Sequence, residues 1–171
     1  SEAERVALQA VILGYLDLQE LLASDSLQNS LTRAKRWVEQ IEAIQFNSND
    51  NDLNQAWRVY QRLLLADLSP LVKTEDLSSA REQFSLLTQT MDRFLAQFGN
   101  ISDQPIRLAH CPMAHDNRGD HWYQRANIVD NVYFGEQMRT CGEIRETLSP
   151  GERLIGEGSA SSTQGGPPHV H

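Results

Sequence analysis

Four sulfur-bearing side chains fall in two short segments of the chain, and together they could bind a soft metal ion. Cys111 and Met113 are separated by one residue, and Met138 lies three positions before Cys141, a spacing that places two side chains on one face of a helical turn. Two thiolates and two thioethers select Cu(I) or Ag(I) over hard ions such as Mg²⁺ or Ca²⁺. The sequence therefore predicts a metal site made by these four residues, with Cu(I) or Ag(I) as the bound ion.

Histidines near the sulfur residues could enlarge this site. His110 directly precedes the first cysteine and is a candidate fifth ligand. Imidazole ligands would shift the preference of the site toward Cu(II) or Zn²⁺. His115 and His121 flank the polar residues 116–120 and are expected to be solvated. His169 and His171 close the chain and are not counted as a site.

A simpler interpretation of the cysteines is a structural disulfide between Cys111 and Cys141. Such a bond would close a loop of 30 residues, and it would stabilise the fold by about 3 to 4 kcal/mol in the chain-entropy model. Met113 and Met138 would then fill gaps in the core, as most methionines do. In this alternative the chain is a structural or protein-interaction module without a metal.

An enzymatic function is not expected. A nucleophilic set of Cys111, Asp120 and a histidine can be imagined, but no family-specific signature accompanies it, and Pro112 follows the thiol directly. The sequence also contains no nucleotide-binding glycine loop, no zinc-protease His-Glu motif and no haem-attachment motif. Because the formal net charge is -8 and no cluster of Lys or Arg occurs, neither nucleic acid nor an anionic membrane surface is expected as a partner. The longest apolar stretches carry charged or polar residues, so no membrane-spanning segment is predicted.

Helical periodicity of apolar residues dominates the first hundred positions. It predicts an all-α fold, an antiparallel four-helix bundle with short connections. The first three predicted helices cover residues 3–23, 27–44 and 53–69, with Ser26 and Asp52 as N-caps of the second and third, and the fourth begins within residues 74–77 and ends at residue 98.

A long irregular segment follows the fourth predicted helix and contains all four sulfur residues of the predicted site. Prolines and glycines interrupt it, and only a short strand at residues 106–109 and a helical turn at residues 135–140 are expected there. We expect one helical metal-binding domain over residues 1–150. Residues 151–171 are poor in apolar side chains and are predicted to form a flexible tail.

The two sulfur segments and their neighbours resemble a known protein family. The matching residues are Cys111-Pro112-Met113-Ala114, the turn at Asn117-Arg118-Gly119 followed by Trp122, the run Asn131-Val132-Tyr133-Phe134-Gly135, Met138, Cys141-Gly142-Glu143, and Arg81-Glu82-Gln83-Phe84 with Leu87. They resemble the C-terminal helical domain, catalogued as a domain of unknown function, of some copper/silver efflux periplasmic adaptor (membrane fusion) proteins. The same domain also occurs as a stand-alone secreted protein.

This resemblance implies a periplasmic protein of heavy-metal resistance that captures Cu(I) or Ag(I) and hands it on. Its implied ligands are Cys111, Met113, Met138 and Cys141, and its implied partners are efflux pump subunits or a periplasmic metallochaperone. Two positions depart from the family pattern, since His110 stands where an aromatic residue is commoner and Val132 where proline is commoner.

Overall fold

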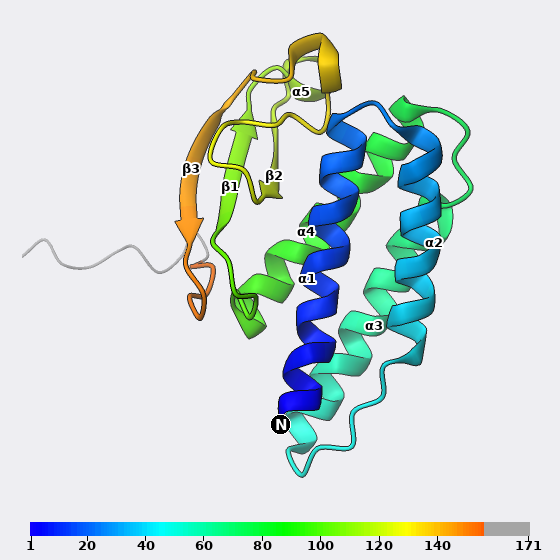
Figure 1. The fold of residues 1–171 in the computed structure, drawn as a ribbon, viewed down its shortest axis with the longest axis vertical. Helices are drawn as coiled ribbons and strands as arrows, with labels where there is room; N and C mark the ends of the chain where they lie inside the picture. Colours follow the sequence, from blue (N-terminus) through cyan, green and yellow to red (C-terminus); the bar gives the residue numbers. More distant parts are fainter. Residues whose placement is uncertain (156–171) are drawn as a thin grey trace, which may run out of the picture.

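Four long helices form most of the molecule, and a small sheet covers one side of them (Figure 1). The computed structural model describes residues 1–155. The helices are α1 (Glu2–Ala23), α2 (Leu27–Ala43), α3 (Asn51–Leu71) and α4 (Leu77–Phe98). The four predicted helices are therefore confirmed, and their bounds differ from the predicted ones by two residues or fewer.

Side-chain caps fix where three of these helices begin. Ser1 and Glu4 form a reciprocal capping box at the start of α1. Asp76 accepts a hydrogen bond from the amide of Ser79 at 2.7 Å and caps α4. The cap of α3 is Asp50 rather than the predicted Asp52, because the loop before the helix is shorter than expected and Asp52 lies within the first turn.

The prediction of an all-α fold is confirmed only for the helices, because the segment after α4 forms a three-stranded antiparallel sheet. Its strands are β1 (Ile106–Cys111), β2 (Asp120–Gln124) and β3 (Glu143–Leu148), in the order β2-β1-β3. The predicted strand at residues 106–109 is confirmed and continues to Cys111. The expected helical turn is also present, as the 3-10 helix η1 (Gly135–Met138).

The sheet shares one core with the helices. Tyr15 of α1 stacks on Phe84 of α4 with 4.8 Å between the ring centroids, and it contacts Tyr123 of β2 edge-on at 6.0 Å. Each of these rings is almost fully buried. Burial of large aromatic side chains is a dominant source of stability, so β2 is held firmly on α1 and α4.

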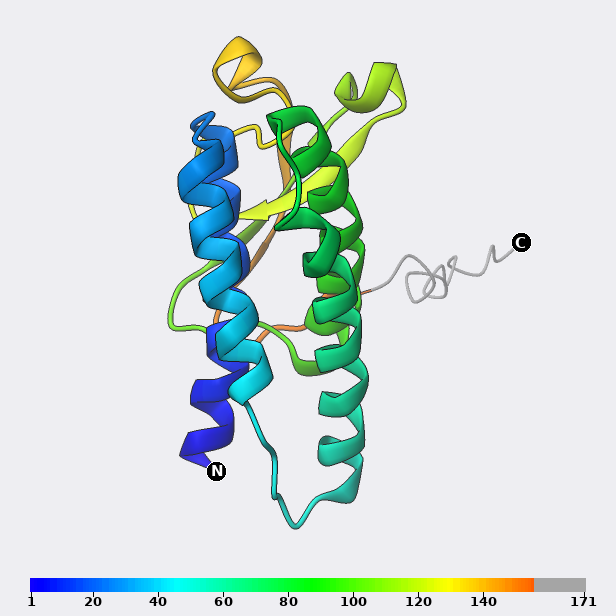
Figure 2. The same ribbon diagram turned by 90° about the vertical axis from the view of Figure 1, so that its right-hand side faces the viewer.

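The connections between the strands gather at one end of the molecule. Figures 1 and 2 show the short segment α5 (Ala114–Asn117) and η1 at this same end, beyond the end of α1 and the start of α4. This end carries both predicted sulfur segments. At the other end of the sheet, residues 151–154 return to α4, where Leu154 N donates to Leu95 O at 3.2 Å. The rest of the predicted tail, residues 156–171, lies outside the described part of the chain.

Helix α1 is long and apolar enough to cross a membrane by length and hydropathy alone. Its most apolar 18-residue window has a mean hydropathy of 1.4, but 56% of that window is buried inside the protein. The core helix of a helical bundle is buried to a similar extent and can be equally apolar. The helix is here a central element of the fold.

Candidate metal centre

The two cysteines meet where β1 ends and β3 begins. Cys111 is fully buried, Cys141 is partly buried in the turn before β3, and their Sγ atoms are 3.2 Å apart. A disulfide bond is about 2 Å long, so these are two free thiols in contact. The hydrogen bond from Cys111 raises the pKa of the Cys141 thiol. Strand pairing explains the meeting, since His110, next to Cys111, pairs with Glu143, which lies two residues after Cys141.

Gly142 allows the turn that carries Cys141 to approach β1. Its φ angle is +126°, which side chains rarely adopt. A Cβ atom on Gly142 would also lie 2.4 Å from the carbonyl oxygen of His110. A larger residue at this position would therefore push the second cysteine away from the first.

Asn131 fixes the loop that leads from β2 to Cys141. Its side-chain amide donates to the carbonyl oxygen of Cys141 at 2.8 Å. Its side-chain oxygen accepts hydrogen bonds from the backbone amides of Tyr133 and Phe134, both at 2.9 Å. One fully buried side chain thus holds both the cysteine turn and the start of η1.

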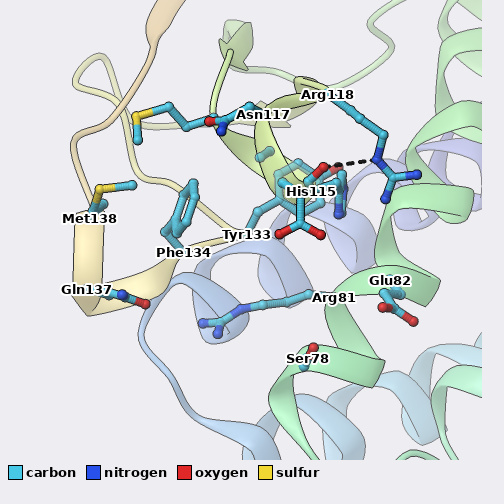
Figure 3. Close-up of a pocket in the computed structure, with 13 residues that line it drawn as sticks. Ser78, Arg81, Glu82, His115, Asn117, Arg118, Tyr133, Phe134, Gln137 and Met138 are labelled. Atoms are coloured by element: carbon cyan, nitrogen blue, oxygen red, sulfur yellow. Dashed lines mark hydrogen bonds between the residues drawn. The ribbon is translucent and has the colours of Figure 1, made fainter.

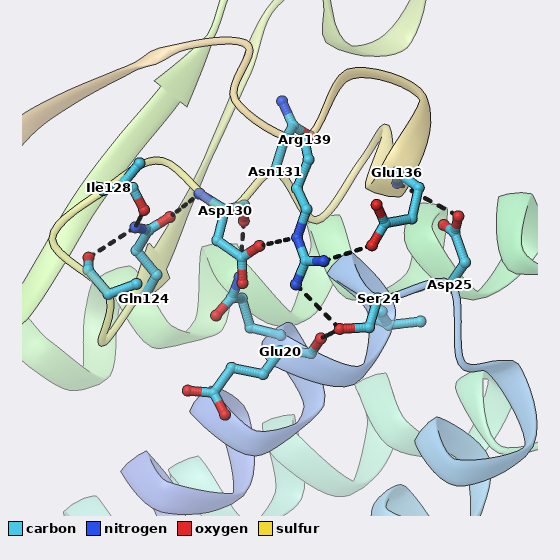
Figure 4. A network of polar contacts seen from close by, with 12 residues as sticks. Glu20, Ser24, Asp25, Gln124, Ile128, Asp130, Asn131, Glu136 and Arg139 are labelled. Carbon is cyan, nitrogen blue, oxygen red and sulfur yellow. Dashed lines mark hydrogen bonds and ion pairs between the residues drawn. The ribbon is translucent and has the colours of Figure 1, made fainter.

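Polar contacts attach this loop to the end of α1 (Figure 4). Arg139 pairs with Asp130 at 2.6 Å and donates to Ser24 Oγ at 3.2 Å. Gln19 of α1 donates to the carbonyl oxygen of Asp130 at 2.8 Å. The loop that carries Met138 and Cys141 is therefore fixed at several points, although little of it is regular secondary structure.

Arg81 performs the same task from α4. Its guanidinium donates to the carbonyl oxygen of Val132 at 2.7 Å and to that of Leu22 at 2.6 Å, and it pairs with Asp25 at 2.5 Å. Arg81 and Asn131 both belong to the residues that carry the family resemblance. Arg81 holds this loop at Val132, and Asn131 holds the turn that carries Cys141.

The methionines lie on a pocket of about 560 Å³ between α4, α5 and η1 (Figure 3). Met113 is 45% exposed and Met138 is partly buried. Both line the pocket, whereas neither cysteine does. The structure thus groups the four predicted ligands as a contacting cysteine pair and a methionine pair on one pocket.

His110 lies in the middle of the sheet, between His121 on β2 and Glu143 on β3. Burial lowers the pKa of its imidazole, and the nearby Arg145 lowers it further. A Cβ atom on Gly119 would be 3.2 Å from His110 Nε2, which places this nitrogen against the turn before β2. His110 does not line the methionine pocket.

The expectation that His115 and His121 are solvated was wrong. His115 Nε2 donates to Asp120 Oδ2 at 2.7 Å, and His121 Nε2 pairs with Asp92 of α4 at 2.8 Å. His121 Nδ1 also lies 3.3 Å from Asp120 Oδ1. The polar residues around these histidines suggested exposure. Successive side chains of a strand point to opposite faces, so His121 lies on the same face of β2 as Tyr123, and this face packs on α4. This alternation could have indicated that His121 is partly buried.

The paired carboxylates predict a pH-dependent stability. Hydrogen bonds to Asp120 and Asp92 raise the pKa of His121 from 6.5 to about 9. A raised pKa stabilises the folded state fully below pH 6.5, and the stabilisation is lost as the pH rises through 9. Since part of the side chain is exposed and screened by solvent, we expect a loss of about 1 to 2 kcal/mol.

Urea unfolding at a series of pH values checks this expectation. His121→Gln is the matched variant, because it keeps a polar side chain and removes the titrating group. Its unfolding free energy should change less between about pH 6.5 and 9.5 than that of the wild type. Equal slopes in the two proteins would show that His121 is not the responsible group. Asp92, Asp120, Tyr123 and the neighbouring His110 face the same ring, so the comparison is made with all four unchanged.

Over residues 1–155, no three His, Cys, Asp or Glu side chains form a group that could hold a metal ion. A family model described as "Protein of unknown function (DUF3347)" matches residues 11–103, which run from within α1 past the end of α4 and stop before β1. No curated protein and no solved structure matches the chain. Since the matched region exceeds half of the 171 residues, the chain belongs to the DUF3347 family of proteins of unknown function.

Proposed function

We propose that the protein binds one Cu(I) or Ag(I) ion between the thiolates of Cys111 and Cys141 and passes it on in heavy-metal efflux. The observation that carries the proposal is the contact of two free thiols at 3.2 Å, held by strand pairing and by Asn131. Two thiolates are sufficient for a soft monovalent ion, which accepts low coordination numbers.

The two thiols have different surroundings, and this difference suits capture and release. Zinc–thiolate bonds are about 2.3 Å long, and two metal–thiolate bonds of similar length in line would span about 4.6 Å. The sulfur atoms must therefore separate by somewhat more than about 1 Å when the ion binds. Cys111 is fixed in the core, whereas Cys141 lies in a partly exposed turn. Cys141 is the thiolate that moves, and a partner's sulfur can replace it first.

The methionines would assist rather than replace the thiolates. Met113 follows Cys111 by two residues, and Met138 precedes Cys141 by three, so each thioether is tethered close to one thiolate. The two thioethers line a pocket that the cysteines do not line, and they would attract Cu(I) rather than harder ions. His110 stays a predicted additional ligand.

The periplasmic location and the partner are proposed from the resemblance of the sulfur segments to efflux adaptor domains. The partner would be an efflux pump subunit or a periplasmic metallochaperone that presents its own sulfur ligands. The formal net charge of -8 would attract a cation such as Cu(I).

Thiol counting followed by an anaerobic Cu(I) titration against a competing chelator tests the proposal. We expect two free thiols and one tightly bound Cu(I) ion per chain. The affinity should fall as the pH is lowered, because both thiols must lose a proton and the pKa of Cys141 is raised. Absence of Cu(I) uptake by the fully reduced protein would contradict the proposal.

The same sulfur contact favours a second function, that of an interaction module with a Cys111–Cys141 disulfide. The two sulfur atoms would have to move about 1 Å closer to each other to form this bond. An oxidant would accept the two electrons, and the two thiol protons would be released. No free thiols as purified, together with no Cu(I) binding after reduction, would establish this alternative.

A further inference from the structure

We infer that the pocket between α4, α5 and η1 is a second, weaker soft-metal site, made by Met113, Met138 and His115, at which the ion is captured first. The existence of this site is independent of the thiolate centre. The order of transfer, from pocket to cysteines, rests on the proposed function.

The pocket brings two thioethers from different elements to one solvent-accessible space. Met113 precedes α5 and Met138 ends η1. Met113 is one of the few large apolar side chains with nearly half of its surface exposed. Figure 3 shows Met138 beside Phe134 on one side of the pocket, with His115 farther along its wall. Thioethers carry no proton, so they can bind a soft ion without the deprotonation that thiols require.

His115 is arranged as a metal-binding histidine often is. Its Nε2 donates to Asp120 Oδ2 at 2.7 Å, and that oxygen also accepts a hydrogen bond from Ser85 of α4 at 2.5 Å. A carboxylate bound to one ring nitrogen fixes the tautomer and leaves a lone pair on the other. Within residues 1–155, His115 Nδ1 has no hydrogen-bond partner, and the side chain lines the pocket.

The backbone around His115 is strained in a way that serves this arrangement. His115, Asp116 and Asn117 have φ angles of 52°, 56° and 65°, three left-handed residues in succession without a glycine. The left-handed conformation is unfavourable for most residues with a side chain, and Asp and Asn tolerate it better than the others. Such strain persists where surrounding contacts hold it, and it is concentrated at functional sites. Here the turn presents His115 to Asp120 and to the pocket at once.

The charges on the pocket wall do not favour an anion. Arg81 already donates to two carbonyl oxygens and to Asp25, and Arg118 Nε donates to the carbonyl oxygen of His115 at 2.9 Å. Glu82 and Asp116 line the same space and balance these cations. The neutral sulfur and nitrogen donors are therefore the groups that distinguish this pocket.

Methyl-labelled methionine NMR with Ag(I) as the probe tests the inference. Ag(I) is diamagnetic and does not change oxidation state on binding here. The experiment uses the Cys111→Ala, Cys141→Ala double variant, which lacks the thiolates. We expect the Met113 and Met138 methyl signals to shift together on titration. Met91 is a built-in control, since it is 1% exposed in α4 and its signal should stay in place.

A matched control variant makes the test specific. His115→Gln in the double-alanine background should weaken Ag(I) binding about tenfold or more, because it removes the nitrogen ligand. Met91→Leu in the same background should leave the binding unchanged, because Met91 is buried in α4 and does not line the pocket. Absence of shifts at Met113 and Met138, or equal effects of the two variants, would overturn the inference.

The wild type provides a second measurement in case the double variant does not fold. With Ag(I) added beyond one equivalent, the thiolates are filled and the next equivalent should shift the two methionine signals. Thiolate binding without methionine shifts would remove the pocket site and leave the proposed function intact. Methionine shifts without thiolate binding would do the reverse.

Discussion

Replacing Cys111 and Cys141 together by alanine is expected to lower the affinity for Cu(I) about a thousandfold or more, equivalent to at least about 4 kcal/mol. The reason is that the thiolates are the only negatively charged soft ligands in the proposed centre, and their charge neutralises the ion. The thioethers and His115 would then supply the remaining weak binding. Competition with a Cu(I) chelator under anaerobic conditions measures this change.

Single variants and a methionine control make the result interpretable. Cys141→Ala should increase the rate at which a chelator removes the ion more than Met138→Leu does, because a thiolate binds more strongly than a thioether. Met91→Leu removes a sulfur atom from the core and should leave the affinity unchanged. Wild-type affinity in the double-alanine variant would contradict the thiolate centre.

The four helices could be predicted because each carries a continuous apolar stripe at helical spacing. Trp37 and Ile41 on α2, and Trp57 and Leu64 on α3, are buried where that spacing placed them. The cap of α3 could not be placed as well, because Asp50 and Asp52 are both good N-cap residues and only the geometry of the loop selects between them.

The sheet was largely missed because its edge strand has little apolar signal. Within β3 only Leu148 is buried, and the other residues alternate between exposed and partly buried positions. A strand of this kind is defined by backbone pairing with β1, which local sequence patterns do not report. The sequence between β1 and β2 also contains Gly119 and three residues in left-handed conformations, so no regular period connects the strands.

Backbone pairing between distant strands also limited the prediction of the site. Cys111 and Cys141 were rightly singled out as neighbours, but their contact depends on the pairing of His110 with Glu143 across β1 and β3. The pairing of His115 with Asp120 is invisible in the sequence for a related reason. It requires a left-handed turn that non-glycine residues rarely form. Long-range pairing and strained turns are properties of the folded chain.

Gly14→Ala is expected to lower the unfolding free energy by about 2 to 3 kcal/mol, through a steric clash in the core. A Cβ atom on Gly14 of α1 would lie 2.3 to 2.4 Å from three atoms of the Trp37 ring on α2. Trp37 is fully buried, so its indole cannot move aside into solvent. The clash outweighs the gain of about 1 kcal/mol that alanine has over glycine within a helix. Urea unfolding followed by circular dichroism measures the change.

A double-mutant cycle with Trp37→Leu identifies the cause of this loss. The atoms that would clash, Cδ1, Nε1 and Cε2, belong to the five-membered ring of the indole, and leucine has no ring, so a methyl group at position 14 can be accommodated beside it. In the Trp37→Leu background, Gly14→Ala should therefore destabilise the protein by about 1 to 2 kcal/mol less than it does in the wild type, a coupling expected for residues in direct contact. Additive effects of the two substitutions would mean that the indole is not the obstacle. The close approach of α1 and α2 would then have another reason for requiring glycine.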